Sequence, residues 1–360
     1  MKKIVLCGNY GGINTGDEAI LQGFLSVLKG KAHITVLSHN PQHTANAYQE
    51  YEIETAHVFP MGVKSMLKNT FNGEKNKTVR AIKNADLFIL GGGSLFTDEE
   101  SWRAPLNWHW QAKVAKRNNT KIIMFGQTVG PISSNYLRNL TAETFNWADE
   151  IYVRDAESQN FLNEIGIKKT SIKTGDCALL LNKHMANSDT KTPHNINGDV
   201  LFIPRDWPNG PNVSEIAKML TQITKRKVKT LSLYRDLEKF EQDGGTEPSP
   251  QRSECIGPLK LIEEMQNSSL VVSMRLHGNI LAAIAGTPFI PLSYSKKVNG
   301  FMKEVEYPVI FDWENFSQQE LEKAVAKIID PNSASQNTEA LQKKIDTIAT
   351  QTANYLNSLL

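Results

Sequence analysis

The sequence predicts an α/β fold made of two doubly wound domains, and three observations predict it. Short apolar runs alternate with longer amphipathic segments, which is the pattern of parallel strands joined by helices. At 360 residues the chain is longer than one hydrophobic core usually supports. A polar segment at 183–198 interrupts the alternation and has the composition of a linker. We therefore expect a first domain at 1–184, a second at 196–332 and a C-terminal helix at 333–360.

Each expected domain has its own strands and helices. In the first half the apolar runs predict strands at Lys3–Cys7, His33–Leu37, Asp86–Leu90, Lys121–Phe125 and Glu150–Val153, with helices near 17–29, 104–117, 135–147 and 156–165. In the second half they predict strands at Asp199–Ile203, Lys229–Leu233, Leu270–Val272, Pro288–Leu292 and Val309–Phe311, with helices at Val213–Thr224 and Gly257–Gln266. The last helix, around Thr338–Leu359, could pack back across the first domain, although the sequence does not require it.

Charge and cysteine content exclude some classes of protein. The 40 basic and 38 acidic residues give a net charge of +2, which lacks the electrostatic footprint of a nucleic-acid-binding protein. Cys7, Cys177 and Cys255 lie far apart and form no C-x-x-C pair, as expected for reduced thiols of a cytosolic protein. The apolar run after Met1 is too short for a signal peptide, and no stretch approaches the length of a membrane span. We expect a soluble, cytoplasmic protein.

The most informative segment runs from Ser273 to Lys297. Arg275 and His277 follow the buried strand pattern Leu270–Val272, so they should emerge at its carboxyl end, where open α/β sheets place their ligand sites. Lys296 and Lys297 follow the next strand. An Arg, a His and a Lys together suit an anionic substrate that exchanges a proton. In the alternative interpretation His277 caps a helix and Arg275 pairs with a buried carboxylate, but cations at two successive strand ends favour the site.

Three polar, glycine-rich loops are expected where first-domain strands end. The first, Gly8–Glu18, lacks both G-x-G-x-x-G and a P-loop lysine; Asn14 or Thr15 should cap the next helix. Its Asp17 would repel a phosphate and either favours sugar hydroxyls or stabilises the helix dipole. A tight turn without ligand contact explains this loop equally well.

The other two loops carry further candidate binding residues. Gly91, Gly92 and Gly93 stand before Ser94 and Asp98, and three adjacent glycines cost more chain entropy than a turn requires, so we expect a ligand contact there. The Gln127 amide, in Gly126–Pro131, is able to hydrogen-bond a sugar hydroxyl or acetamido group.

These motifs together resemble the polysaccharide pyruvyl transferases. The similarity rests on Asn14–Leu21, Gly91–Leu95, Gly126–Pro131, Val153–Ser158, Arg275–Gly278 and Ser293–Val298, and it extends over about 4–304. Within that family the chain resembles bacterial enzymes that place a pyruvate ketal on N-acetylmannosamine of a lipid-linked secondary cell-wall polymer precursor. Two departures are Ser295-Lys296-Lys297, where the family often has Asp-Pro-Lys, and the aromatic cluster Trp108-His109-Trp110.

The resemblance implies a glycosyltransferase-B-like (GT-B-like) pair of Rossmann-like domains with the site between them, and phosphoenolpyruvate (PEP) as donor. PEP carries a carboxylate and a phosphate, for which Arg154, Arg275 and either Lys296 or Lys297 are the expected clamps, with Arg205 as a further candidate. His277 is the expected acid and base, since histidine exchanges protons near neutral pH. The reaction requires no metal or cofactor, and no paired-ligand spacing is present.

Two other functional classes remain open at this stage. A nucleotide-sugar-dependent glycosyltransferase could use the same scaffold, with Arg275 and Lys297 holding a diphosphate and His277 or Asp98 acting as base. A sugar-binding protein without activity has little use for this cation set.

A basic segment between Met61 and Lys83 suggests how a soluble chain could reach a polyprenyl-diphosphate-linked acceptor at the inner face of the plasma membrane. It carries Lys64, Lys68, Lys75, Lys77, Arg80 and Lys83 against one Glu74, interspersed with apolar residues. A solvated basic helix is the alternative and the more common occurrence.

Overall fold

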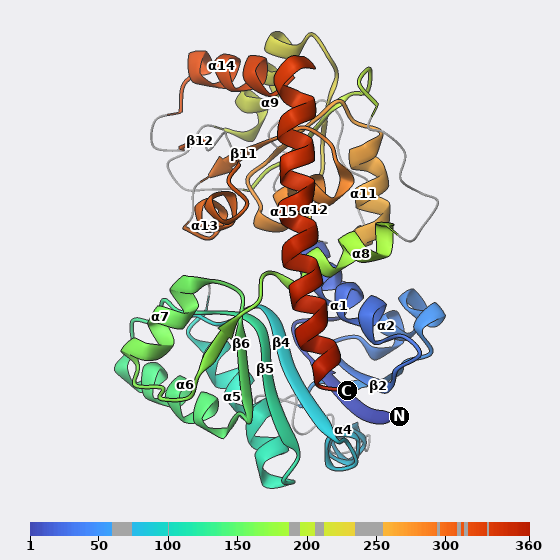
Figure 1. Cartoon of the computed structure of the whole chain (residues 1–360), viewed down its shortest axis with the longest axis vertical. Helices are drawn as coiled ribbons and strands as arrows, with labels where there is room; N and C mark the ends of the chain where they lie inside the picture. Colours follow the sequence, from blue (N-terminus) through green and yellow to red (C-terminus); the bar gives the residue numbers. More distant parts are fainter. Residues whose placement is uncertain are drawn as a thin grey trace. The chain divides into compact units, whose positions relative to one another are not determined.

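The computed structural model describes residues 1–59, 74–99, 101–186, 195–205, 212–234, 255–293, 296–307, 311–312, 316–329 and 331–360. It confirms an α/β fold with two parallel sheets (Figure 1). The chain forms two compact units. The first unit comprises Met1–Gly12, Ile20–Leu180 and Thr350–Leu360, and the second unit comprises Ile13–Ala19 and Leu181–Ala349.

The first unit contains a seven-stranded parallel sheet in the order β3-β2-β1-β4-β5-β6-β7. The strands are β1 (Lys2–Cys7), β2 (Ala32–Ser38), β3 (Glu54–His57), β4 (Leu87–Phe96), β5 (Lys121–Val129), β6 (Glu150–Val153) and β7 (Ser171–Lys173). All five strands predicted in this half are present. The edge strands β3 and β7 escaped prediction because they are short and only partly buried, so they lack an apolar run.

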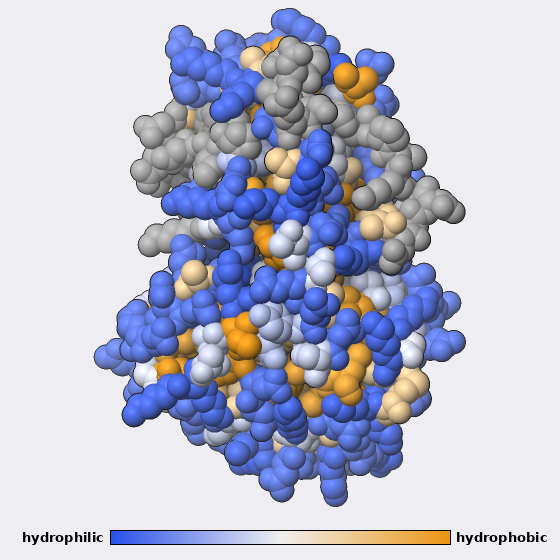
Figure 2. Space-filling view, in the orientation of Figure 1, coloured by the Kyte–Doolittle hydropathy of each residue, from blue (hydrophilic) through white to orange (hydrophobic). Residues whose placement is uncertain are grey.

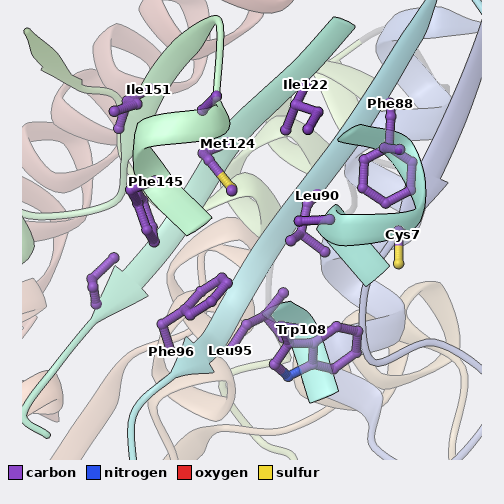
Figure 3. Packing of buried hydrophobic residues seen from close by; sticks show 14 of the residues in the cluster. Cys7, Phe88, Leu90, Leu95, Phe96, Trp108, Ile122, Met124, Phe145 and Ile151 are labelled. Atoms are coloured by element: carbon purple, nitrogen blue, oxygen red, sulfur yellow. The ribbon is translucent and has the colours of Figure 1, made fainter. Parts of the chain in front are cut away.

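Helices cover both faces of this sheet. On one face, side chains such as Phe88, Leu90 and Met124 pack against Trp108 and Phe145 (Figure 3). The covering helices there are α4 (Glu74–Lys83), α5 (Arg103–Arg117), α6 (Asn135–Trp147) and α7 (Ala156–Glu164). The other face meets α1 (Thr15–Leu28), whose Phe24 ring lies 5.6 Å from that of Phe125. Burial of each such side chain contributes about 1.5–3 kcal/mol to folding.

The second unit contains a five-stranded parallel sheet in the order β12-β11-β10-β8-β9. Its strands are β8 (Val200–Ile203), β9 (Val228–Thr230), β10 (Leu270–Ser273), β11 (Phe289–Ser293) and β12 (Phe311–Asp312). Its helices are α8 (Leu181–Ala186), α9 (Val213–Thr224), α11 (Pro258–Gln266), α12 (Leu276–Ala285), α13 (Lys296–Glu304) and α14 (Gln318–Ile329). Part of the predicted strand Val309–Phe311 lies outside the described residues.

Two segments belong to a different unit from their neighbours in sequence. In sequence, α1 follows β1 of the first unit, but its first turn belongs to the second unit. The last helix, α15 (Pro331–Ser358), starts in the second unit, and its end belongs to the first. There Thr352 Oγ1 donates to the Thr174 carbonyl at 3.1 Å, and the ring centroids of Tyr355 and Tyr152 lie 5.5 Å apart. The helix begins earlier than predicted because Pro331 is compatible with a first helical turn.

Each sheet reverses its strand order at one point. The reversal lies between β1 and β4 in the first unit and between β8 and β10 in the second. Ligands of open α/β sheets bind at the carboxyl ends of the strands at such a point. The surface in Figure 2 is mainly hydrophilic, and none of the described helices is long and apolar enough to cross a membrane.

Candidate active site

Two arginines follow adjacent strands at the reversal point of the second unit. Ile203 at the end of β8 stands opposite Ser273 at the end of β10, so Arg205 and Arg275 emerge from neighbouring strands. Arg275 Nε donates to the Pro204 carbonyl at 3.4 Å, which holds the guanidinium beside the end of β8. The structure thus brings together two cations that lie 70 positions apart in sequence.

The backbone of Arg275 is fixed by a buried serine and a buried asparagine. Ser273 Oγ accepts from Arg275 N and donates to Arg275 O, both at 3.0 Å, and Asn279 Nδ2 donates to the same carbonyl at 3.0 Å. A methyl group on Gly278 would overlap Ser273 Oγ, so only glycine permits this packing. Arg275, and not His277, occupies the N-cap position of α12. The motif Arg275–Gly278 therefore presents an arginine on a rigid turn.

Tyr234 is a contact of Arg275 that sequence reasoning missed. The guanidinium carbon lies 4.6 Å from the centroid of the Tyr234 ring, within the range of a cation–π interaction. Tyr234 pairs with Asn14 in an antiparallel bridge, and Thr15 N donates to the Leu233 carbonyl at 2.9 Å. No sequence signal marks Tyr234, because its partner is distant along the chain. The ring therefore covers one side of the Arg275 guanidinium.

His277 lies in the first turn of α12 and packs against the first turn of α1. A methyl group built on Gly16 would lie 2.5 Å from His277 Cγ and closer still to Nδ1, so the imidazole occupies the space that the missing side chain leaves. Gly16 was not among the predicted site residues. The segment Ile13–Ala19 therefore contacts both Tyr234, which stacks on Arg275, and His277.

The cap of α1 resolves one alternative left by the sequence. Asn14 Oδ1 accepts from Gly16 N at 3.0 Å, which makes Asn14 the capping residue, and its Nδ2 donates to Asp17 Oδ2 at 3.0 Å. Thr15 Oγ1 instead donates to the Ile256 carbonyl at 2.8 Å. Asp17 is buried, only 8% exposed, and lies three residues along the chain from the cap. Asn14 thus orients one carboxylate in the segment that touches His277.

Cys255 adjoins this segment, and its surroundings disfavour the thiolate form. Burial, followed by the nearby Glu18 carboxylate, raises the pKa of its thiol to about 12. The thiol therefore stays protonated near neutral pH. Cys7 and Cys177 are buried free thiols whose pKa values burial also raises.

The two candidate lysines follow β11, the neighbour of β10. Ser273 stands opposite Pro291 of β11, and α13 begins at Lys296. Lys297 is half-buried, whereas the side chain of Lys296, together with Tyr294 and Ser295, lies outside the described residues. Three adjacent strands, β8, β10 and β11, are thus each followed closely by a basic residue.

Arg154, the fourth expected clamp, lies in the first unit within a buried ion-pair cluster. Its Nη1 lies 3.1 Å from Asp176 Oδ2 and its Nε 3.3 Å from Asp155 Oδ2. Burial alone would lower the pKa of Arg154, but the two carboxylates outweigh it and raise the pKa. The cluster has two negative charges against one positive charge, so Arg154 brings no surplus of positive charge to this place. Asp176 had not been predicted.

Gly92, Gly93 and Ser94 correct the expectation of a loop after the third predicted strand. They lie inside β4, which continues to Phe96, and both glycines have positive φ angles of 81° and 78°. A side chain at Gly92 would overlap Ile20 of α1. Gly92 allows an irregular strand to approach the helix closely, and a ligand contact at these glycines stays a prediction.

Gln127 and Asp98 have structural partners as well. Gln127 lies inside β5, fully buried, and its amide donates to the Leu90 carbonyl of β4. The loop expected at Gly126–Pro131 is therefore mostly strand, which extends because its residues pair with β4 and β6. Asp98 Oδ2 accepts from Ser133 N at 2.8 Å and so links two loops.

The reversal point of the first unit is filled by a tyrosine. Tyr10 follows β1, is only 1% exposed, and donates its hydroxyl hydrogen to the Gly91 carbonyl of β4 at 2.8 Å. Among the described residues, no group of three or more His, Cys, Asp and Glu side chains is arranged to hold a metal ion. Of the predicted basic residues, Arg205, Arg275, Lys296 and Lys297 follow strands of the second sheet, whereas Arg154 lies in the first unit.

Comparison with known structures and families agrees with this architecture. A UDP-GlcNAc 2-epimerase from Neisseria meningitidis bound to UDP-GlcNAc superposes with a TM-score of 0.61 at 13% identity, over 100% of this chain and 99% of its own. Anabaena Alr3699/HepE in complex with UDP-glucose gives a TM-score of 0.62 at 14% identity, over 99% and 100%. These similarities show the GT-B fold alone. Residues 14–296 match the family described as polysaccharide pyruvyl transferase.

Proposed function

Because this chain belongs to the polysaccharide pyruvyl transferase family, we propose that it moves the enolpyruvyl group of PEP onto two hydroxyls of one sugar and releases phosphate. The observation that carries the proposal is that Arg205, Arg275 with His277, and Lys297 follow three adjacent strands of one parallel sheet. This arrangement suits a donor with two anionic groups and a carbon atom that must be protonated.

Arg275 is the proposed ligand of the PEP carboxylate. Its planar guanidinium lies over the Tyr234 ring and is hydrogen-bonded to the Pro204 carbonyl, and such a fork matches a carboxylate with two parallel hydrogen bonds. Arg205 and Lys297, which follow the flanking strands, are the proposed ligands of the phosphate. A preorganised cation set stabilises the charge that develops on the leaving phosphate.

His277 is the proposed proton donor and acceptor. Protonation of the methylene carbon of PEP makes the neighbouring carbon electrophilic, and one sugar hydroxyl attacks it. Phosphate leaves, and a second hydroxyl of the same sugar attacks to close the ketal. The two hydroxyl groups release two protons. One replaces the proton that His277 gave to the methylene carbon, and the other leaves with phosphate, so His277 ends in its starting protonation state.

The acceptor is proposed to be N-acetylmannosamine of a polyprenyl-diphosphate-linked cell-wall precursor, made in the cytoplasm. The motif resemblance supports this substrate. Within the second unit, Asp17 and Asn14 supply hydroxyl-binding groups on the segment that contacts His277. A carboxylate accepts hydrogen bonds from sugar hydroxyls and is a poor neighbour for phosphate, so this pair suits the acceptor better than the donor.

The proposal is tested by incubating the protein with PEP and a panel of N-acetylhexosamine acceptors. Release of inorganic phosphate, together with an acceptor mass increased by one pyruvyl ketal, is expected. A parallel incubation with UDP-sugars in place of PEP tests the glycosyltransferase alternative. Release of UDP and transfer of a hexosyl group, with no reaction of PEP, would contradict the proposal.

A further inference from the structure

Positive charge is concentrated on two neighbouring helices of the first unit. In sequence, α4 carries four basic residues and one Glu, and α5 carries four basic residues and no acidic one, so the two have a net charge of +7. The whole chain has +2, which leaves −5 for all other residues. Such an asymmetry is unexpected for randomly distributed surface charge and indicates an anionic partner.

The basic side chains of these helices face solvent on one side of the sheet. Ile82 of α4 and Trp108 of α5 enter the same core cluster, so both helices cover the same sheet face. Their opposite sides expose Lys77, Arg80 and Lys83 on α4 and Arg103, Lys116 and Arg117 on α5. We call this exposed side of α4 and α5 the basic surface.

Two tryptophans lie among these cations. Trp102, next to the start of α5, is 59% exposed, and Trp110, within the helix, is 38% exposed. Arg103 lies 5.3 Å from the Trp102 ring centroid and Lys113 lies 4.7 Å from that of Trp110. On a helix, positions 103, 110, 113 and 117 share one side, because their spacing follows the helical repeat. An exposed tryptophan leaves apolar area in water that a partner could cover.

Exposed tryptophan combined with lysine and arginine fits the headgroup region of a membrane. Tryptophan prefers the interface between water and lipid, where its ring is buried and its N–H stays hydrated. Each basic residue near an anionic leaflet adds on the order of 1 kcal/mol of attraction. A nucleic acid would also attract the cations, but the chain as a whole lacks the positive field of such proteins.

We propose that the basic surface docks the protein on a bilayer that contains anionic phospholipid. The expected basic segment Met61–Lys83 contributes α4 to this surface, while its part from Met61 to Gly73 lies outside the described residues and is not used. This proposal involves no residue of the candidate active site and does not depend on the proposed function.

Vesicle sedimentation without PEP or acceptor tests the proposal. The protein should sediment with vesicles of phosphatidylcholine and phosphatidylglycerol, stay in the supernatant with phosphatidylcholine alone, and dissociate as salt increases. Replacing Lys77, Arg80 and Lys83 by Gln should weaken partitioning on the order of 100-fold. The matched control replaces Lys323, Lys327 and Lys343 of α14 and α15, which removes the same charge elsewhere, and should bind as the parent does.

Trp102→Ala separates membrane docking from attraction to any polyanion. Because Trp102 is largely exposed, the melting temperature of the variant should equal that of the parent. Its loss should reduce vesicle binding even where salt already screens the cations. Three outcomes would overturn the proposal: no vesicle binding at low salt, equal loss of binding in the α4 variant and its control, or binding of duplex DNA that exceeds vesicle binding and is unchanged in Trp102→Ala.

Discussion

Replacing Gly16 by Ala should disable the site while leaving the fold intact. Gly16 lies in the first turn of α1, and the new methyl group would stand 2.5 Å from His277 Cγ. Ordinary carbon–carbon contact begins near 3.5 Å, so the imidazole must move by about 1 Å. The helix itself tolerates the change, because Ala is favoured over Gly by about 1 kcal/mol within a helix.

The expected effect is on turnover. A displacement of about 1 Å in a catalytic group costs on the order of 100-fold in rate, so kcat should fall by about that factor. The KM for PEP should change less than about threefold, since Arg275 and Arg205 keep their supports. Phosphate release measured against PEP concentration separates the two constants. Gly257→Ala is the matched control, because nothing lies within 4 Å of the new methyl group.

A double variant makes the argument refutable. If Gly16 acts only through the imidazole, then Gly16→Ala should have little further effect in a His277→Ala background, because the displaced group is gone. Equal losses in both backgrounds would show that Gly16 acts through something other than His277. A melting temperature lowered by many degrees in Gly16→Ala alone would show that the fold, and not the imidazole, absorbs the strain.

Three further predictions address the acid–base residue, the donor clamp and the buried ion pairs. His277→Ala should lower kcat by about 100- to 10,000-fold with PEP binding retained by calorimetry; a loss below threefold would exclude proton transfer by His277. Tyr234→Phe should keep PEP affinity near that of the parent, whereas Tyr234→Ala should weaken it about five- to tenfold through loss of the ring under Arg275. Equal affinities of the two variants would show that the Tyr234 ring does not contribute to donor binding. Burial alone would raise the pKa of Asp155, but Arg154 and hydrogen bonds from Ser158 lower it below its usual 3.8, so its contribution to stability is complete above that value and is lost as pH falls below it. The midpoint of urea unfolding should therefore fall less between pH 6 and pH 3 for Asp155→Asn than for the parent, and the variant should have the lower midpoint at pH 6. An equal fall of the midpoint in both proteins would contradict this.

The prediction of the fold succeeded where burial leaves a local trace. The central strands β1, β4, β5, β8 and β10 are buried on both faces and read as continuous apolar runs. The edge strands β3 and β7 are partly exposed and carry no such run. The glycines Gly92 and Gly93 misled the prediction, because positive φ angles serve an irregular strand as well as a loop.

The candidate site was predictable in its residue types and not in its contacts. Arg275, His277 and the lysines stood out because a strand pattern precedes them, and the parallel sheet gathers strand ends at one edge. Gly16 lay within a recognised motif, but its contact with His277 had no signal, and Tyr234 and Asp176 carried none at all, since their roles depend on Arg275 and Arg154 elsewhere in the sequence. Arg154 had the expected residue type but lies in a cluster whose carboxylates already balance it.

The sequence by itself determined the alternation of strands and helices, the family, and the basic residues that end the strands of the second sheet. Periodicity and motif spacing are local properties, and each is visible within a few turns of chain. Only the tertiary structure decided that the first turn of α1 joins the second unit, where Gly16 meets His277 and Thr15 and Asn14 support Tyr234. Contacts of this kind form between chain segments more than 200 positions apart, and they follow from how surfaces pack rather than from any pattern along the chain.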